Sequence, residues 1–199
     1  MKIVRYPLYR SYIKRWAGAI IALFGLILLW PVMLFISILI IQDSKGSIIF
    51  RQQRLGFDKK PFTIYKFRTM VSKKECDSRP ACKNDPRITK VGAFLRRTSL
   101  DELPQLINII KGDMCIIGPR PILREEFLPY QEHAKYHKRF EAKPGLFCTV
   151  DTRMRAMATR EIQFQMDAEY AENITMVKDI ILFIKIVLPV LKQENIYKK

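Results

Sequence analysis

Acidic residues are absent from residues 1–16, and charged residues of either sign are absent from residues 17–41. No A-x-A-like cleavage site follows the uncharged run, which is too long for the apolar core of a typical signal peptide. A straight helix needs roughly 20 apolar residues to span a bilayer. The sequence therefore predicts that residues 17–41 enter a membrane, and it favours this reading over a cleaved leader.

Positive charge flanks the run on both sides. The basic residues are Lys2, Arg5, Arg10, Lys14 and Arg15 before it, and Lys45, Arg51, Arg54, Lys59, Lys60, Lys66 and Arg68 after it. Such charge favours the cytoplasmic side of a membrane, so both ends favour the same side. Pro31 lies near the middle of the run, lacks an N–H and kinks a helix. These features favour a re-entrant helix–break–helix; the alternative is a slightly bent helix that spans the bilayer once.

The chain has 199 residues and a formal net charge of +16. This length predicts one domain beside the membrane segment. We expect residues 1–45 to form an interfacial lead-in and a membrane hairpin, and residues 46–199 to form a membrane-apposed cytoplasmic domain. The charge predicts anionic partners: phospholipid headgroups, nucleotides or nucleic acid. No helix-turn-helix, zinc-finger or RRM signature is present, so nucleic acid is not favoured.

Cysteine is scarce, and no two cysteines form a C-x-x-C pair. A cytoplasmic domain keeps its thiols reduced, although Cys76 and Cys82 flank a polar loop and could pair or help bind a metal. His133 and His137 have a spacing that can hold zinc on a helix. Their charged neighbours favour a solvated helix face instead.

The order of predicted elements indicates a mainly α fold with a small β-hairpin, an α+β class. Strands are expected at 47–51 and 62–68, and a polar loop at 72–86. Ser99 and Glu102 form a potential capping box for a helix over 100–110, which Gly112 would end. Further helices are expected at 122–141 and 159–171. The segment 175–192 is either core or an amphipathic helix in the membrane interface.

Three groups of residues are suited to phosphate chemistry. Asp101 and Glu102 are adjacent acids at a predicted helix start, where plain capping is the alternative. Arg120 lies between two prolines, which stiffen the turn and suit bidentate phosphate binding, although Pro-Arg-Pro is also simply a rigid loop. The cations that could join them are Lys66, Arg68, Arg87, Arg96 and Arg97. The alternative for these cations is a solvated or lipid-facing surface.

The order of several segments is more specific than any one of them. They are FRQQRLG at 50–56, YKFRTM at 65–70, NDPRITKVG at 84–92, LRRTSLDELPQL at 95–106 and KGDMCIIGPRP at 111–121. Following one hydrophobic segment, this series resembles the bacterial sugar transferase family, the small monotopic polyprenyl-phosphate phosphoglycosyl transferases. The resemblance is dense from about residue 10 to residue 146.

The resemblance implies a reaction and a location. Members transfer a sugar-1-phosphate from a UDP-sugar to a polyprenyl (undecaprenyl) phosphate and release UMP. They lie on the cytoplasmic face of the bacterial inner membrane, with a helix–break–helix in one leaflet and both ends cytoplasmic. A homo-oligomer is left open. The rival classes are a non-catalytic membrane-anchored scaffold and a nucleic-acid-binding protein.

The resemblance also implies roles for individual residues. Asp101 matches the nucleophile that forms a phosphosugar-aspartyl intermediate, and Glu102 matches its partner acid. Both would bind Mg²⁺, the family's metal. Arg120 matches the phosphate-binding arginine, with Arg96 and Lys66 as basic residues of the same site. Arg68 and Arg87 are included as further expected phosphate ligands.

The sequence departs from the family pattern in three places. One is Cys115, which follows Gly-Asp-Met where the family usually has serine. At the membrane break, Trp30 precedes Pro31 where a serine is frequent. After Pro144-Gly-Leu, residues 147–156 differ from the usual Thr-Gly-Trp-Ala-Gln-Val-Asn-Gly-Arg-like stretch. Arg153 or Arg155 could replace the missing arginine.

Overall fold

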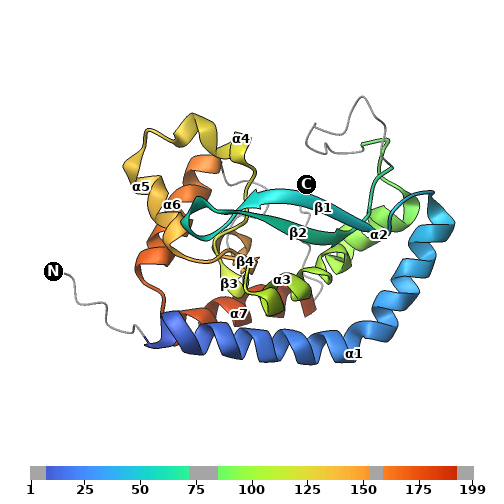
Figure 1. Cartoon of the computed structure of the whole chain (residues 1–199), viewed down its shortest axis with the longest axis horizontal. Coiled ribbons are helices and arrows are strands. Elements are labelled where there is room, and N and C mark those ends of the chain that lie inside the picture. Colours follow the sequence, from blue (N-terminus) through green and yellow to red (C-terminus); the bar gives the residue numbers. More distant parts are fainter. Residues whose placement is uncertain (1–7, 72–84, 153–158, 192–199) are drawn as a thin grey trace.

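The structure is a computed structural model that describes residues 8–71, 85–152 and 159–191. A long helix, α1 (Lys14–Asp43), runs along one side of the molecule, and the remaining elements lie together on its inner side (Figure 1). A π-helical turn at Tyr9–Ile13 leads into this helix. Residues 153–158, which include the possible replacement arginines, lie outside the described residues, as do Cys76 and Cys82.

Helix α1 is a single helix from Lys14 to Asp43 and contains Pro31. Figure 1 shows that α1 bends in its second half, the half to which Pro31 belongs. The predicted interruption is therefore a bend within one helix. This agrees with the physics of proline, which removes one backbone hydrogen bond and crowds the preceding turn without ending every helix.

Both halves of α1 pack on the rest of the chain. In the first half, Ala22 is buried in a cluster with Ile109 and Met114. In the second half, Ile36 and Ile40 are buried with Phe67 and Leu95. The outward residues are large, apolar and exposed: Ile20, Ile21, Phe24, Ile27, Leu28, Trp30, Leu34, Phe35, Ile38 and Ile41. The helix thus has an inner face that packs on the domain along its length and an outer face suited to lipid.

The predicted hairpin is confirmed. Strands β1 (Ile49–Leu55) and β2 (Pro61–Phe67) are antiparallel and are connected through the short 3₁₀ turn Phe57–Lys59. Phe50 lies opposite Lys66, and Arg54 lies opposite Phe62. Opposite residues share a face and side chains alternate along each strand, so Arg54 and Lys66 lie on the same face of the hairpin.

The predicted capping box at Ser99 is wrong. Ser99 instead ends a preceding helix, α2 (Lys90–Thr98), with a left-handed φ of 58°, and its side chain makes no capping bond. A 3₁₀ turn, Leu100–Glu102, follows, and α3 (Gln105–Lys111) begins only after Pro104. Gly112, with φ of 89°, ends α3 as expected. The two acids therefore lie on a tight turn between two helices.

A second, parallel pair of strands was not expected. Strand β3 (Cys115–Gly118) pairs with β4 (Gly145–Cys148). A Cβ at Gly145 would lie 2.1 Å from the backbone nitrogen of Gly118, so only glycine permits this close approach of two backbones. The pairing fixes the start of the Pro-Arg-Pro turn, which directly follows β3.

The single helix predicted over 122–141 is wrong. The segment forms α4 (Arg124–Phe127), a 3₁₀ turn Leu128–Tyr130, α5 (Ala134–His137) and a 3₁₀ turn Lys138–Glu141. Pro129 interrupts the helix, and the short pieces instead fold around an aromatic cluster. That cluster contains Phe127, Tyr136, Phe140 and Phe164.

The two C-terminal helices are confirmed. A 3₁₀ turn, Thr149–Thr152, leads toward α6 (Arg160–Glu172), which Thr159 caps, and α7 (Met176–Leu191) follows. Lys14 of α1 contacts Asp179 of α7 at 2.6 Å and also bonds the hydroxyl of Tyr170. Several apolar side chains of α7 are exposed: Met176, Val177, Ile180, Ile181, Phe183 and Ile184. The ion pair of Lys14 and Asp179 thus connects α7 to the start of α1.

Candidate active site

Asp101 and Glu102 are held on the turn between α2 and α3. The left-handed Ser99 reverses the chain before them, and Pro104 delays the next helix after them. Strand β2 brings Lys66 to this turn, where its ammonium nitrogen lies 2.7 Å from Oε1 of Glu102. Both side chains of this pair are partly buried. One carboxylate of the adjacent acids is therefore paired with a cation.

Asp101 has an environment that differs from that of its neighbour. Burial raises the pKa of Asp101 to about 6; Lys66 and Arg96 oppose this rise, and the charge of Glu102 adds to it. A carboxylate with such a pKa is mostly ionised at neutral pH, but it is poorly solvated. Poor solvation makes an anion more reactive toward a phosphorus centre, provided that nearby cations neutralise the phosphate.

Arg96 approaches the acids from the last turn of α2. Its Nε donates a hydrogen bond of 2.9 Å to Oγ1 of the buried Thr69. Arg96 is also close enough to lower the pKa of Asp101. The contact with Thr69 orients the guanidinium beside the carboxylates.

Arg120 lines a small cavity together with Lys66 and Glu102. Its backbone is fixed by a buried network. Arg139 donates to the carbonyl of Arg120 at 2.7 Å and to Oδ2 of Asp167 at 2.6 Å. Asp167 also accepts hydrogen bonds from the Arg120 backbone and from Oγ1 of Thr149. The two prolines therefore restrict the backbone of the Pro-Arg-Pro turn, and hydrogen bonds to Arg139 and Asp167 fix the backbone polar groups of Arg120.

Two of the predicted phosphate ligands lie elsewhere. Arg68 donates to the carbonyl of Ser44 at 2.6 Å and to that of Ile40 at 3.4 Å, where it caps the C-terminal end of α1. Arg87 makes a close ion pair with Asp85, at 2.7 Å. The structure brings Lys66, Arg96 and Arg120 to the acids, and it places Arg68 and Arg87 in local structural contacts.

Several residues of the site were not indicated by the sequence. Arg54 and Gln105 line the small cavity beside Arg120. Arg139 and Asp167 support the Arg120 turn from behind. The hairpin register could have indicated Arg54, because it shares a face with Lys66. No local pattern indicated Arg139 or Asp167, which are brought together by packing.

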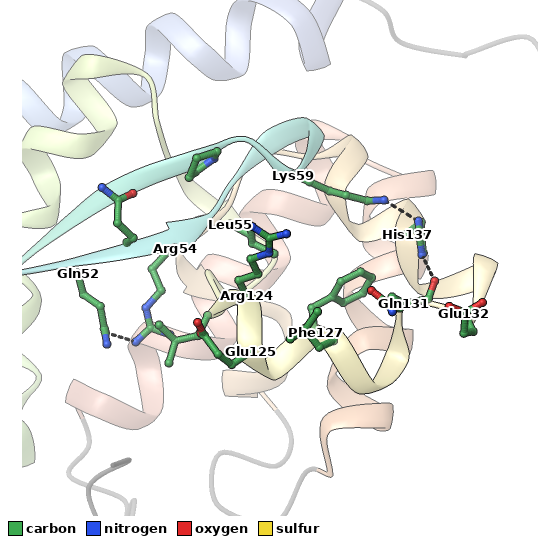
Figure 2. A pocket seen from close by; sticks show the side chains of 14 residues that line it. Gln52, Arg54, Leu55, Lys59, Arg124, Glu125, Phe127, Gln131, Glu132 and His137 are labelled. Carbon is green, nitrogen blue, oxygen red and sulfur yellow. Dashed lines mark hydrogen bonds between the residues drawn. The ribbon is translucent and has the colours of Figure 1, made fainter. Parts of the chain in front are cut away.

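Two hollows of different size meet at Arg54. The small cavity has a volume of about 40 Å³. The larger groove, about 950 Å³, lies between the hairpin and the segment from α4 to α5 (Figure 2). Its lining combines apolar side chains such as Phe127 and Leu128 with polar and charged ones, among them Gln52, Lys59, Glu125, Gln131 and His137. Arg54 lines both hollows, so it lies at their junction.

The acids fit a divalent cation only in part. Within the described ranges 8–71, 85–152 and 159–191, no cluster of three or more His, Cys, Asp or Glu side chains is suited to hold a metal. Mg²⁺ is commonly bound by one or two carboxylates together with substrate phosphates. Asp101 and Glu102 suit that mode, in which the substrate supplies the remaining ligands.

The profile of the bacterial sugar transferase family matches residues 9–193, and the chain belongs to this family. The chain is 34% identical over 202 residues to the undecaprenyl-phosphate galactose phosphotransferase of Salmonella typhimurium, covering 94% of this chain and 42% of the relative. It is 44% identical over 136 residues to the UDP-glucose:undecaprenyl-phosphate glucose-1-phosphate transferase of Escherichia coli, covering 67% of this chain and 29% of the relative.

A relative of comparable length is also similar. The exopolysaccharide production protein PSS of Rhizobium leguminosarum is 37% identical over 186 residues, covering 84% of this chain and 89% of the relative. The chain thus spans less than half the length of the two enterobacterial relatives, and most of the length of the rhizobial one.

Proposed function

We propose that this protein transfers a sugar-1-phosphate from a UDP-sugar to undecaprenyl phosphate or a similar polyprenyl phosphate. The names of the Salmonella and Escherichia coli relatives support both the reaction and the substrates. The observation that carries the proposal is that cations lie close to both acids. Lys66 pairs with Glu102, Lys66 and Arg96 both lower the pKa of Asp101, and Arg120 lines a small cavity with Lys66 and Glu102. An enzyme that joins two polyanions needs such cations.

The mechanism is a double displacement at phosphorus. An oxygen of the Asp101 carboxylate attacks the phosphate that bears the sugar, the bond from that phosphorus to the UMP oxygen breaks, and UMP leaves. The phosphosugar is then held on Asp101 as an acyl phosphate ester. A phosphate oxygen of the polyprenyl phosphate attacks the same phosphorus, and the bond to Asp101 breaks, which regenerates the carboxylate.

The surrounding residues lower the electrostatic barrier to this attack. Lys66, Arg96 and Arg120 offset the negative charge that accumulates when a carboxylate approaches a phosphate. Glu102 keeps Lys66 in place through their ion pair. Arg120 is pre-organised by its prolines and by the network of Arg139 and Asp167, so little reorganisation is needed when the substrate binds.

Asp101 and Glu102 would also hold Mg²⁺, together with the phosphates of the donor. When bound, the ion supplies positive charge that neutralises the diphosphate and stabilises the leaving UMP. Two adjacent acids favour a bound cation, because each carboxylate disfavours the charge of the other; for the pKa of Asp101, the charge of Glu102 adds to the larger effect of burial.

The topology that we propose is re-entrant, with both ends of α1 on the cytoplasmic face. Near its start, Arg15 donates to the carbonyl of Ile109 at 2.7 Å. At its end, Asp43 accepts from the backbone N–H of Val91 at 2.9 Å. These contacts connect both ends to the same globular part, which a straight spanning helix would separate. The exposed apolar face of α1 would then lie in one leaflet, beside the exposed face of α7.

The proposal includes location and partners. The bacterial relatives and the lipid substrate in their names support the cytoplasmic membrane, with anionic phospholipid around the basic surface. The scaffold and nucleic-acid-binding alternatives give no role to Asp101, which is partly buried and lies near Lys66 and Arg96. No described feature favours either of them.

Release of UMP from a panel of UDP-sugars tests this function. The full-length protein in lipid nanodiscs should release UMP from one or a few of them in the presence of undecaprenyl phosphate and Mg²⁺. The product lipid should carry sugar and diphosphate. If no member of the panel yields UMP, while the protein is folded and membrane-bound, the proposed function is wrong.

A further inference from the structure

Two residues that line the small cavity each carry a buried hydrogen-bond donor with no partner in the described part of the chain. These donors are Nε2 of Gln105 and Nε of Arg54. An unpaired buried donor costs about 1–3 kcal/mol, so native proteins rarely retain one without a reason. Two such donors around one cavity suggest that an acceptor from outside the protein completes them.

The position of Gln105 at the start of α3 places this residue in the lining of the small cavity. It is the first residue of α3, directly after Pro104, and its side chain is only 2% exposed. The amide is neutral, so it adds a donor beside the acids without changing the charge of the site. A buried amide in this place is suited to a phosphate oxygen.

Both terminal nitrogens of the Arg54 guanidinium have partners within the protein, but its Nε has none in the described residues. One terminal nitrogen donates to Oε1 of Gln52 at 2.6 Å, and the other lies 3.6 Å from Glu126. Figure 2 shows the Arg54 guanidinium beside Gln52, at the edge of the large groove. The remaining N–H is therefore the one available to a ligand in the small cavity.

The small cavity brings positively charged side chains close together. Burial lowers the pKa of Arg54, and the nearby guanidinium groups of Arg120 and Arg160 lower it further, although Glu126 opposes them. Arg54 and Arg120 both line the small cavity. Lys66 and the acid Glu102 line it too, so the cations of the cavity outnumber its acids and an anionic ligand would be attracted to it.

We propose that Arg54 and Gln105 donate hydrogen bonds to phosphate oxygens of the sugar-nucleotide donor, beside Arg120 and Lys66. This inference rests on the proposed function, since it assigns two more residues to the same substrate. The volume of the cavity, about 40 Å³, is a few times the ~10–15 Å³ that one water requires, which suits a single phosphoryl group.

The position of Arg54 favours the donor over the lipid. A phosphate in the small cavity can continue past Arg54 into the groove of about 950 Å³, where polar and charged residues lie among apolar ones. Residues of β1 and α4 line that groove. Figure 1 shows α4 and α1 on opposite sides of the hairpin. A polyprenyl chain would instead approach from the apolar face of α1. The donor's polar remainder therefore fits the groove.

Direct binding of UDP to the full-length protein in nanodiscs tests the inference without turnover. Gln105→Met keeps the length of the side chain and removes the donor. We expect its Kd for UDP to rise about tenfold or more, the usual effect of one lost hydrogen bond to a charged group. Arg54→Lys keeps the charge but removes Nε, and we expect a similar rise. The thermal midpoint of Gln105→Met without ligand should equal or exceed that of the wild type, because an unpaired buried amide is lost.

Gln163→Met is the matched control. Gln163 is also buried with an unpaired Nε2, but it lies in α6 and does not line the small cavity. Its Kd for UDP should stay within twofold of the wild type. Wild-type affinity in Gln105→Met and Arg54→Lys would overturn the inference, as would a KM effect confined to the polyprenyl phosphate. A wild type that binds UDP yet transfers no phosphosugar would overturn the proposed function and leave this inference standing.

Discussion

The guanidinium of Arg139 donates a hydrogen bond of 2.7 Å to the backbone carbonyl of Arg120. The side chain of Arg139 is almost fully buried and is also paired with Asp167 at 2.6 Å. A buried ion pair of this kind adds little net stability, because desolvation offsets most of the attraction. Its role here is positional, since it fixes the turn that presents Arg120 to the cavity.

Variants of Asp167 and Arg139 should separate the effect of this pair on folding stability from its effect on the position of Arg120. Asp167→Asn leaves the charge of Arg139 buried without its counter-ion, and we expect a loss of about 3–5 kcal/mol of folding stability. The double variant Arg139→Met/Asp167→Met removes both charges and should recover most of the thermal midpoint. It should not recover UMP release, because the Arg120 turn has lost its hydrogen bonds. A double variant with wild-type kcat/KM would show that the network has only a structural role.

Arg120→Lys should lose most of its activity although the charge is conserved. Lysine presents a single ammonium group and cannot make the planar two-point contact of a guanidinium with phosphate. We expect kcat/KM for the UDP-sugar to fall at least tenfold, with the thermal midpoint unchanged. Arg97→Lys is a suitable control, because Arg97 is exposed in the last turn of α2. If Arg120→Lys retains near-normal kcat/KM, only a point charge is required there.

The first half-reaction should depend on the protonation of Asp101. Burial raises the pKa of this carboxyl to about 6, so the reactive anion is lost as the pH falls below that value. UMP release in a single turnover without lipid acceptor should fall about tenfold per pH unit below 6. Leaving out the acceptor removes the titration of the polyprenyl phosphate from the profile. A rate that is flat down to pH 5 would contradict the assignment.

Asp101→Asn should be inactive but more stable at neutral pH. The folded-state pKa of Asp101 lies above its ordinary value of 3.8, so the ionised form destabilises the fold. The stability that protonation provides is present below about pH 4 and is lost as the pH rises through 6. We expect the variant to gain roughly 2–3 kcal/mol at pH 7.5, at 1.36 kcal/mol per unit of pKa, and nothing at pH 4. A lower thermal midpoint at pH 7.5 would show that Asp101 is structurally required.

The topology can be tested with single cysteines in a cysteine-free background. Ser11→Cys and Lys45→Cys place exposed thiols on either side of α1. A re-entrant helix predicts that neither labels with an impermeant reagent in intact cells and that both label after the membrane is opened. Labelling of one position alone in intact cells would show that α1 spans the bilayer. We also expect Pro31→Ala to favour the spanning form, because it removes the cause of the bend.

The elements that the sequence predicted correctly are those fixed by local patterns. Turn residues indicated the hairpin of β1 and β2, and a broad apolar face indicated α7. The roles of Asp101, Glu102 and Arg120, which the family motifs imply, stay predictions. The exact turn that carries the acids was missed, because Ser99 adopts a left-handed conformation instead of capping a helix.

Several features that the sequence did not indicate depend on contacts between segments far apart in the chain. The parallel pairing of β3 and β4 joins segments on either side of the aromatic cluster, and no periodicity reports it. Arg68 matched a basic motif, but it follows the end of β2 and reaches the carbonyls that end α1. Arg87, in contrast, forms an ion pair with Asp85, which lies two residues before it. Only the packed structure distinguishes a phosphate ligand from a helix cap.

The most direct test of the account is the identification of a covalent intermediate. The full-length protein should be incubated with its UDP-sugar and Mg²⁺ without lipid acceptor, then quenched and digested for mass spectrometry. The account predicts a sugar-phosphate adduct on Asp101, which is absent from Asp101→Asn and disappears when undecaprenyl phosphate is added. An adduct on another residue, or turnover by the Asp101→Asn variant, would contradict it.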